Sequence, residues 1–239
     1  MEFKSYIKQS DCFDEFKNIK DNTIDLVCVD LPYGQTACKW DSVIDLSKMW
    51  DELKRICKDE CVYVFFCTTK FGHSLISSNK KWFRYDIVWQ KSTNVGFLNA
   101  NKMPLRNHEM IYVFYKKWNI YNPQKTIGKP YKMIKNKKGN IGVYGKDYHR
   151  TSINNNGDRY PTSIIKYNLP KKSIHKTQKP LGVLEWIIKT YSNENDIVLD
   201  FTMGSGSTIE ACINTKRQYI GIEKDNDIFN IAKNRIDNL

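Results

Sequence analysis

The sequence has few acidic residues and no grouped metal or disulfide ligands. Only 26 Asp and Glu stand against 38 Lys and Arg, no C-x-x-C pair occurs, and the four histidines lie apart from the seven scattered cysteines. A zinc site or a disulfide framework is therefore not expected, and the thiols are predicted to be reduced and buried. No apolar run could span a membrane and the first residues have no apolar signal core, so we expect a cytoplasmic protein.

The length and composition predict one sizeable α/β domain with an added lobe. The chain has 239 residues, of which 41% are hydrophobic, which is enough for a core. Its formal net charge of +12 favours a polyanionic partner. Charge alone leaves nucleic acid open, because a basic protein can simply be soluble.

One predicted strand ends in an unusual group of side chains. The apolar run Ile24–Val29 suits a buried strand, and Asp30, Leu31, Pro32 and Tyr33 follow it. Pro32 fixes its own φ and biases Leu31 toward an extended conformation, so the carbonyls before the ring point in defined directions. Acceptors beside an aromatic face suit a planar base with an exocyclic amine. The alternative is a strand that runs into an ordinary turn.

A second strand end lies at Asp200. Ile197–Leu199 is a short apolar run, and the loop Gly204–Thr208, which contains two glycines, precedes a helix predicted from Ile209 to Thr215. Glycines let the backbone approach a ligand, and a helix N-terminus offers unpaired N–H groups. This loop therefore predicts a binding site for a small ligand.

The following strand indicates the kind of ligand. Tyr219–Ile222 ends in Glu223, about twenty residues after the loop begins, where a Rossmann-like unit places its ribose-binding carboxylate. The third glycine of a dinucleotide fingerprint would fall at Ile209 and is absent. An adenosine ligand without a pyrophosphate fits this pattern better.

Together, the stretches Asp30–Tyr33 and Asp200–Gly206 resemble the β group of S-adenosylmethionine-dependent DNA amino-methyltransferases. In that family an Asp/Asn/Ser-Pro-Pro-Tyr-type tetrapeptide is catalytic, a Phe-x-Gly-x-Gly loop binds the cofactor, and in the β group the catalytic element comes first. Gly34–Asp41, His175–Pro180 and Tyr219–Glu223 also look like family stretches. Leu31 stands where the family more often has proline; we expect this to be tolerated, because the second residue contributes mainly its carbonyl.

The resemblance implies an α/β fold with a Rossmann-like, seven-stranded methyltransferase sheet and a circularly permuted motif order. It implies a catalytic half over residues 1–115, an inserted target-recognition region over 116–176 and a cofactor-binding half over 177–239. The implied cofactor is S-adenosylmethionine and the implied partner is double-stranded DNA in a bacterial or bacteriophage-infected cell, with no metal and no membrane. A homodimer is left open.

The resemblance also assigns roles to residues. The implied catalytic residues are Asp30, Leu31, Pro32 and Tyr33, and the implied cofactor-binding residues are Asp11, Lys179, Asp200, Phe201, Thr202, Gly204, Ser205, Gly206, Ser207, Thr208 and Glu223. From the sequence alone, Asp11 is favoured as the cap of a helix over Cys12–Ile19. That role and a contact with the cofactor's adenine can coexist.

The implied reaction is methyl transfer to adenine N6 of a flipped base. Asp30 and the carbonyl of Leu31 would each accept one N6 hydrogen, and Tyr33 would stack on the base. No Pro-Cys dipeptide occurs, which argues against the covalent cytosine-C5 route. In the family, Asp at the first tetrapeptide position favours adenine and Ser favours cytosine N4. The alternatives are a cytosine-N4 or RNA methyltransferase and a non-catalytic DNA-binding protein.

The region 116–176 is the predicted DNA-reading lobe. Its only acidic residues are Asp147 and Asp158, and basic residues alternate with tyrosines. Such a composition suits contacts with phosphates and bases, whereas the alternative is a solvated insertion. The predicted DNA-binding residues are Trp40, Lys91, Asn94, Arg150 and Arg159, with the run Asn154–Asn156 as a further candidate.

Two strands are expected to pair antiparallel at a sheet edge, Phe83–Trp89 and Met110–Tyr115. Between them, Lys91–Phe97 and Arg106–Glu109 are predicted to be polar loops near the site. Helices are predicted over Leu46–Cys57, Phe71–Ser77, Leu181–Tyr191 and Ile228–Ile236, and a further buried strand over Cys61–Phe66.

Overall fold

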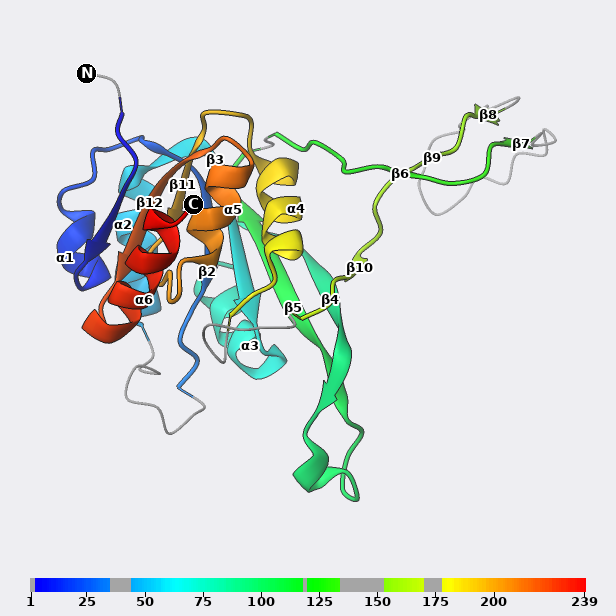
Figure 1. Ribbon diagram of the computed structural model, residues 1–239, viewed down its shortest axis with the longest axis horizontal. Helices are drawn as coiled ribbons and strands as arrows, with labels where there is room; N and C mark the ends of the chain where they lie inside the picture. Colours follow the sequence, from blue (N-terminus) through cyan, green and yellow to red (C-terminus); the bar gives the residue numbers. More distant parts are fainter. Residues whose placement is uncertain (1–2, 35–43, 118–119, 134–152, 170–177) are drawn as a thin grey trace. The chain divides into compact units, whose positions relative to one another are not determined.

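A mostly parallel sheet of eight strands forms the centre of the main structural unit. The computed structural model describes residues 3–34, 44–117, 120–133, 153–169 and 178–239. They divide into one unit of residues 1–122 and 163–239, and a second unit of residues 123–162. The strand order is β1-β12-β11-β2-β3-β5-β4-β10 (Figure 1), so the α/β fold expected from the sequence is confirmed.

The strands of the main sheet are β1 (Tyr6–Gln9), β2 (Ile24–Asp30), β3 (Cys57–Cys67), β4 (Phe83–Val95), β5 (Arg106–Tyr115), β10 (Ile164–Lys166), β11 (Ile197–Asp200) and β12 (Gln218–Glu223). Its helices are α1 (Cys12–Phe16), α2 (Leu46–Ile56), α3 (Thr69–Ser78), α4 (Leu181–Tyr191), α5 (Ser207–Asn214) and α6 (Asn226–Asp237), with the short 3-10 helix η1 (Phe97–Asn99). Among the described strands of this sheet, only β5 pairs antiparallel to its neighbours.

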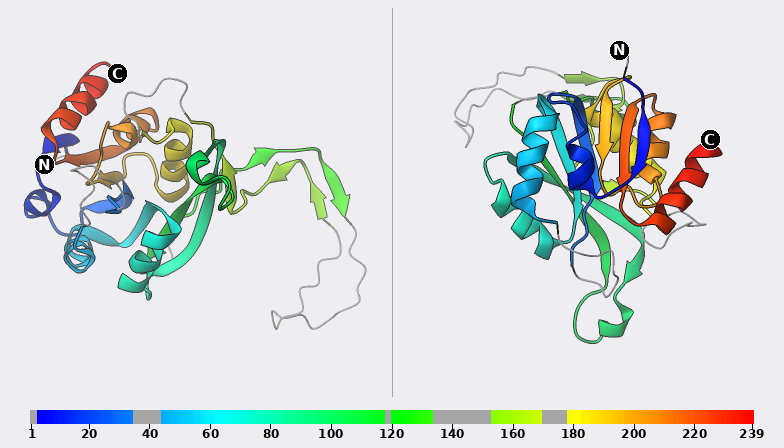
Figure 2. Two further views of the ribbon diagram at one scale, coloured as in Figure 1. Left: turned by 90° about the horizontal axis from the view of Figure 1, so that it is seen from below. Right: turned by 90° about the vertical axis from the view of Figure 1, so that its left-hand side faces the viewer.

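Helices cover both faces of the sheet, which explains why its central strands read as continuous apolar runs. In β2, Val27 and Val29 pack in the core with α1, α2 and α3, while Leu26 and Cys28 pack in the core with α4 and α5. Side chains alternate across a strand, so both sets must be apolar when both faces are buried. Figure 2 shows these helices on either side of the sheet.

The polar residues that end the predicted strands lie together at one edge of the sheet, the edge formed by the carboxyl ends of its parallel strands. Asp30 ends β2, Asp200 ends β11 and Glu223 ends β12, and these strands are parallel and joined through β11. Since β5 is antiparallel, it begins at the same edge. The beginning of β5 and the end of β4 therefore lie on the side of the sheet where open α/β folds bind ligands.

The structure corrects two expectations about this region. The polar loops predicted at Lys91–Phe97 and Arg106–Glu109 are largely strand, because β4 runs on to Val95 and pairs there with Arg106. The antiparallel pairing of β4 and β5 is confirmed, but neither of them is the outermost strand of the sheet. A short strand, β10, pairs with β4, so the sheet has eight strands instead of the expected seven. The stretch Lys91–Val95 is polar up to Asn94 and almost entirely exposed, so it carries no apolar pattern that would indicate a strand.

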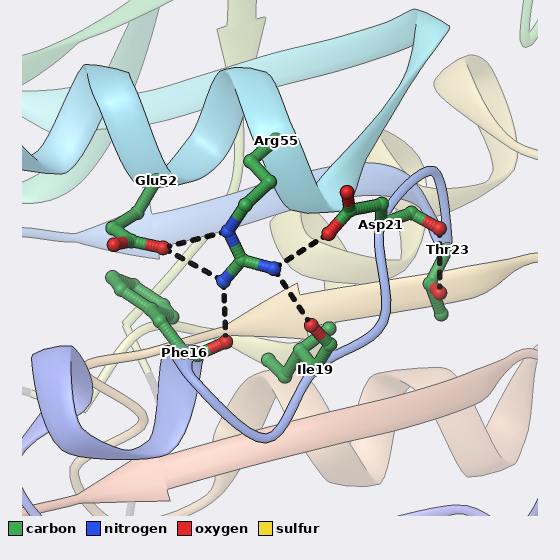
Figure 3. A network of polar contacts seen from close by, with 6 residues as sticks. All are labelled: Phe16, Ile19, Asp21, Thr23, Glu52 and Arg55. Carbon is green, nitrogen blue, oxygen red and sulfur yellow. Dashed lines mark hydrogen bonds and ion pairs between the residues drawn. The ribbon is translucent and has the colours of Figure 1, made fainter.

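An arginine ties α2 to the connection between α1 and β2. Arg55 donates to the carbonyl oxygens of Phe16 (2.7 Å) and Ile19 (3.1 Å) and forms ion pairs with Asp21 and Glu52, each at 2.7 Å (Figure 3). Phe16 is the last residue of α1 and Ile19 lies in the turn that follows, so the guanidinium donates to carbonyls at and just beyond the end of the helix. This contact fixes the chain as it enters β2, the strand that ends in Asp30.

The second unit is built from two short antiparallel pairs. Strands β6 (Thr126–Ile127) and β9 (Asp158–Arg159) form one pair, and β7 (Tyr131–Met133) and β8 (Ile153–Asn155) form the other. The guanidinium of Arg159 contacts Asn155 Oδ1 and the carbonyl of Lys129, and lies 4.8 Å from the ring centre of Tyr131. Arg159 therefore holds the two pairs together.

In the described ranges no helix is long and apolar enough to cross a membrane. No group of three or more His, Cys, Asp or Glu side chains in the same ranges could hold a metal ion. The described cysteines carry free thiols, and all except Cys12 are buried.

Candidate active site

Asp30 lies at the centre of a polar cluster at the end of β2. Tyr33 Oη donates to Asp30 Oδ1, and the Tyr33 ring packs against Phe71 with ring centres 5.3 Å apart. Burial, followed by the charge of Asp30, raises the pKa of Tyr33, so its hydroxyl stays protonated and donates. The side chain of Leu31 is buried in the core, which anchors the turn and fixes its backbone. Asp30, Leu31 and Tyr33 thus form one rigid unit.

A lysine from a distant part of the chain neutralises Asp30. Lys179 Nζ lies 2.5 Å from Asp30 Oδ2 and 3.3 Å from Glu109 Oε2. Glu109 Oε1 in turn pairs with Lys91, which comes from the neighbouring strand β4. The cluster therefore alternates in charge, from Lys91 through Glu109 and Lys179 to Asp30.

The opposite charges in this cluster keep Lys179 and Glu109 ionised despite their burial. Burial lowers the pKa of Lys179, but Asp30 and Glu109 raise it by more, so its pKa lies above the ordinary value. Burial raises the pKa of Glu109, but Lys179 and then Lys91 lower it by more, so the net pKa is lowered. At neutral pH, Lys179 is an ammonium ion and Glu109 is a carboxylate.

The loop after β11 contacts the polar cluster around Asp30. Thr202 Oγ1 donates to the carbonyl of Asp30 at 3.0 Å, and Asp200 Oδ1 accepts from the Thr202 amide at 3.1 Å. Burial raises the pKa of Asp200 to about 7, although hydrogen bonds from Thr208 and Thr202 oppose this. The carboxyl of Asp200 therefore changes its protonation state near neutral pH.

Gly204 and Gly206 have different roles in this loop. Both have positive φ, at 53° and 77°, which favours glycine. A side chain at Gly206 would lie 3.2 Å from Cβ of Ala232, so this glycine lets α6 pack closely on the loop. No atom lies within 4 Å of the same position at Gly204. The open space at Gly204 is where a ligand could approach the backbone.

Glu223 faces Gly204 from the next strand. Its Oε2 accepts from the Gly204 amide at 3.0 Å and its Oε1 from the Asp225 amide at 2.8 Å. Burial raises its pKa, although these backbone hydrogen bonds oppose the effect. Asp11 Oδ1 caps α1 by accepting from the Phe13 amide at 2.9 Å, and this confirms the predicted cap.

These residues fit an adenosine-type cofactor that carries a positive charge. The buried carboxyl group of Asp200 and the partly buried carboxyl group of Glu223 end adjacent strands, and the open space at Gly204 lies in the loop that precedes α5. Carboxylates at such strand ends can accept hydrogen bonds from ribose hydroxyls. A buried carboxyl with a raised pKa is also stabilised in its ionised form by a nearby cation.

Several predicted cofactor residues serve the packing of the loop. Phe201 is buried against Phe16, with ring centres 5.3 Å apart, and Ser207 Oγ contacts Arg235 Nη1 at 3.2 Å. Ser205 and Thr208 are buried. Lys179, which the resemblance placed with the cofactor, pairs with Asp30 and Glu109; its contact with a cofactor stays a prediction.

The predicted DNA-binding residues that the structure describes belong to both units. Lys91 is largely buried and paired with Glu109, while Asn94 is exposed on β4. Arg159 belongs to the second unit. Trp40 and Arg150 lie outside the described residues, so their roles stay predictions.

Glu109 is a site residue to which the sequence analysis assigns no role. The sequence places it in a polar loop near the site, directly before the apolar run Met110–Tyr115. If that run is read as an antiparallel strand, its beginning falls at the edge where β2 ends. A carboxylate at that position was the available signal.

Comparison with known proteins agrees with this geometry. The family named N6_N4_Mtase and described as DNA methylase matches residues 24–234. The chain is 25% identical to Type II methyltransferase M1.MboII of Moraxella bovis over 261 residues, which covers 95% of this chain and 94% of that protein. It is 27% identical over 249 residues to DNA adenine methyltransferase YhdJ of Escherichia coli, covering 97% and 82%. The structure of the M1.HpyAVI–SAM complex superposes with a TM-score of 0.68 at 25% identity, covering 96% of this chain and 98% of that one.

Proposed function

The chain belongs to the DNA methylase family, and from that membership we propose that it transfers a methyl group from S-adenosylmethionine to N6 of adenine in DNA. Membership makes it an S-adenosylmethionine-dependent DNA methyltransferase. The choice of adenine and the flipping of the base are the proposed parts. The observation that carries them is the Asp30 carboxylate, fixed beside the Leu31 backbone and the Tyr33 ring.

Methyl transfer to an amine is a direct displacement, so the protein has to position and polarise the nucleophile. Adenine N6 is a weak nucleophile because its lone pair is delocalised into the ring. If Asp30 and the Leu31 carbonyl each accept one N6 hydrogen, the nitrogen becomes more tetrahedral and its developing positive charge is stabilised. Tyr33 and Lys179 each occupy one oxygen of Asp30, and a carboxylate has about four acceptor positions, so capacity for the amine remains.

The aromatic face of the site supports a flipped base. An enzyme that acts on a base in a duplex must take it out of the stack, which costs a few kcal/mol. Tyr33 would offset part of that cost by stacking, because Phe71 and Asp30 already hold its ring in place. When bound, the cofactor supplies the methyl group on a sulfonium; Glu223, Asp200 and the Gly204 backbone would hold it.

The alternative with the same chemistry is cytosine N4, whose exocyclic amine could use the same acceptors. Asp at the first position of the tetrapeptide favours adenine, and the name of the relative YhdJ supports this choice. An RNA substrate is a further alternative. Single-molecule sequencing of DNA exposed to the protein, with tritiated cofactor on DNA and RNA, tests the proposal. Methylated adenines support it, whereas N4-methylcytosine alone, or label only in RNA, would refute it.

A catalytically inactive DNA-binding protein is the alternative from another class. The connected cluster of Asp30, Tyr33 and Lys179 argues against it, since a binding protein has no need for a partly buried carboxylate held by a lysine. Incorporation of any labelled methyl group into nucleic acid would exclude this alternative.

The region 116–176 is proposed to read the DNA sequence. Its described part contains the second unit, where Lys125 and Lys132 provide positive charge and Asn154 lies on β8. The logarithm of the DNA affinity falls linearly with the logarithm of the salt concentration. Removing a lysine that contacts a phosphate should reduce the slope of this line by about one. Loss of a base-reading residue should instead relax the methylated sequence with little change in slope.

Alanine variants of Lys132 and Asn154 separate these two effects. Arg159→Ala is a poor probe of base reading, because Arg159 also holds the strands of this unit together. If affinity, slope and methylated sequence all stay as in the parent, the region does not read DNA.

A further inference from the structure

The hairpin between β4 and β5 carries an exposed apolar surface that the proposed catalytic function does not use. Phe97 is 69% exposed, Leu98 101%, Met103 58% and Val95 47%. Single exposed apolar residues are common, but here they gather at the tip of one hairpin. Figures 1 and 2 show the hairpin continuing past the helices of the main unit, with η1 at its tip.

Hydrogen bonds within the tip order its backbone. Gly96 begins η1 with φ of 95°, and its carbonyl accepts from the Asn99 amide at 2.9 Å. The amide of Met103 donates to the carbonyl of Asn99 at 3.0 Å. A tip ordered by its own hydrogen bonds loses less conformational entropy when it binds a partner.

The hairpin rises from the edge of the sheet that carries the active site. Glu109, which contacts Lys179 beside Asp30, lies on β5, and the strand from Glu109 to Arg106 rises about 10 Å toward the tip. The apolar residues of the tip precede Arg106 in the chain, so they lie more than about 10 Å beyond Glu109 along the strand direction, on the side away from the sheet. A duplex with its target base at Asp30 would pass within reach of the tip.

The charge of the hairpin selects the partner. The sequence from Lys91 to His108 contains no acidic residue and includes Lys102 and Arg106. This hairpin has no charge complementarity to another copy of itself, whereas the phosphates of DNA attract it. We propose that this hairpin tip is a DNA wedge, in which Phe97, Leu98 and Met103 press against the bases of the substrate duplex beside the flipped nucleotide; the inference rests on the proposed function.

A wedge has a physical purpose in base flipping. Apolar side chains inserted at a base step partly unstack it, and this lowers the further cost of extruding a neighbouring base. Lys102 would contact the phosphates nearby. The wedge thus acts on the duplex, while Asp30 and Tyr33 act on the base.

The test uses a double variant, Phe97→Ser with Leu98→Ser. Its control is Leu239→Ser, which replaces an apolar side chain that is 59% exposed and does not belong to the hairpin. Fluorescence anisotropy should show about a tenfold or greater loss of duplex affinity in the double variant, the scale of one or more lost base contacts, with an unchanged salt slope. Lys102→Gln should instead lower the slope by about one. A duplex with a mismatch opposite the target adenine, already partly open, should recover most of the lost kcat/KM.

Unchanged duplex affinity in the double variant overturns the proposal. So does a change of sedimentation coefficient without a loss of DNA affinity, since that identifies a second copy of the chain as the partner. Anisotropy needs no methyl transfer, so a parent protein that binds through the hairpin but methylates cytosine would overturn only the choice of adenine.

Discussion

Replacing Lys179 by methionine should destabilise the protein in a way that depends on pH. The substitution keeps the length of the side chain but removes the charge between Asp30 (2.5 Å) and Glu109 (3.3 Å). At these distances the attraction amounts to about 7 kcal/mol for Asp30 and about 5 kcal/mol for Glu109 at an effective dielectric constant of about 20, before the cost of burial. Removing one partner of a buried ion pair costs about 3–5 kcal/mol. We expect about 3 kcal/mol, because the Asp30 and Glu109 side chains retain exposures of 28% and 24%.

The sign of the pH dependence follows from the pKa shifts. The pKa of Glu109 is lowered, so its stabilising contribution is present above its unfolded value near 4.5 and is lost as the pH falls through the folded value. The pKa of Lys179 is raised, so its contribution is full below 10.5 and is lost as the pH rises through the folded value. The cluster therefore stabilises the parent fully at neutral pH. In Lys179→Met burial keeps Glu109 protonated to a higher pH, so the deficit in unfolding free energy should narrow from pH 8 to pH 5.

Chemical denaturation at several pH values measures this deficit. Lys189→Met is the matched control, since Lys189 is exposed and lies 3.7 Å from Glu185 in a surface pair worth less than about 1 kcal/mol. If Lys179→Met unfolds like the control at pH 8, or if its deficit is constant with pH, the ion-pair argument is wrong.

Turnover and calorimetric measurements on the same variant also distinguish the two possible roles of Lys179. A loss of turnover of about a hundredfold with unchanged S-adenosylmethionine affinity assigns it to the positioning of Asp30, whereas weakened binding assigns it to the cofactor.

Three further predictions concern the carboxyl groups. Asp30→Ala should lose roughly two to four orders of magnitude in turnover with little change in cofactor affinity, and near-normal turnover would remove Asp30 from the mechanism. Glu223→Ala should weaken S-adenosylmethionine binding by about 1.5–3 kcal/mol in calorimetry, while Glu194→Ala, at an exposed glutamate, should not; equal affinities would count against the ribose contact. The pKa of Asp200 is about 7, and a bound cation favours its ionised form, so cofactor affinity should rise about tenfold from pH 6 to pH 8. Asp200→Asn should flatten this rise, and a parent affinity that is independent of pH contradicts the assignment.

The sequence by itself determined the elements and the local chemistry. The helix Leu181–Tyr191 was predicted with the bounds that the structure shows, because its apolar positions repeat at helical spacing after Pro180. Asp30, Asp200 and Glu223 were recognisable as strand ends, because an apolar run precedes each of them. Short-range signals of this kind are contained in a few neighbouring residues.

Only the tertiary structure decided which side chains meet. Lys179 reaches Asp30 across 149 positions of the chain, and Thr202 reaches it across 172. These contacts depend on the order of the strands, which brings β11 beside β2 and starts β5 at the same edge. A charged residue carries no local mark of its partner, so the sequence places Glu109 in a loop and does not indicate that Lys179 pairs with Asp30. The cost of burying each charge, and the neighbour that compensates for it, are set when distant strands pack together.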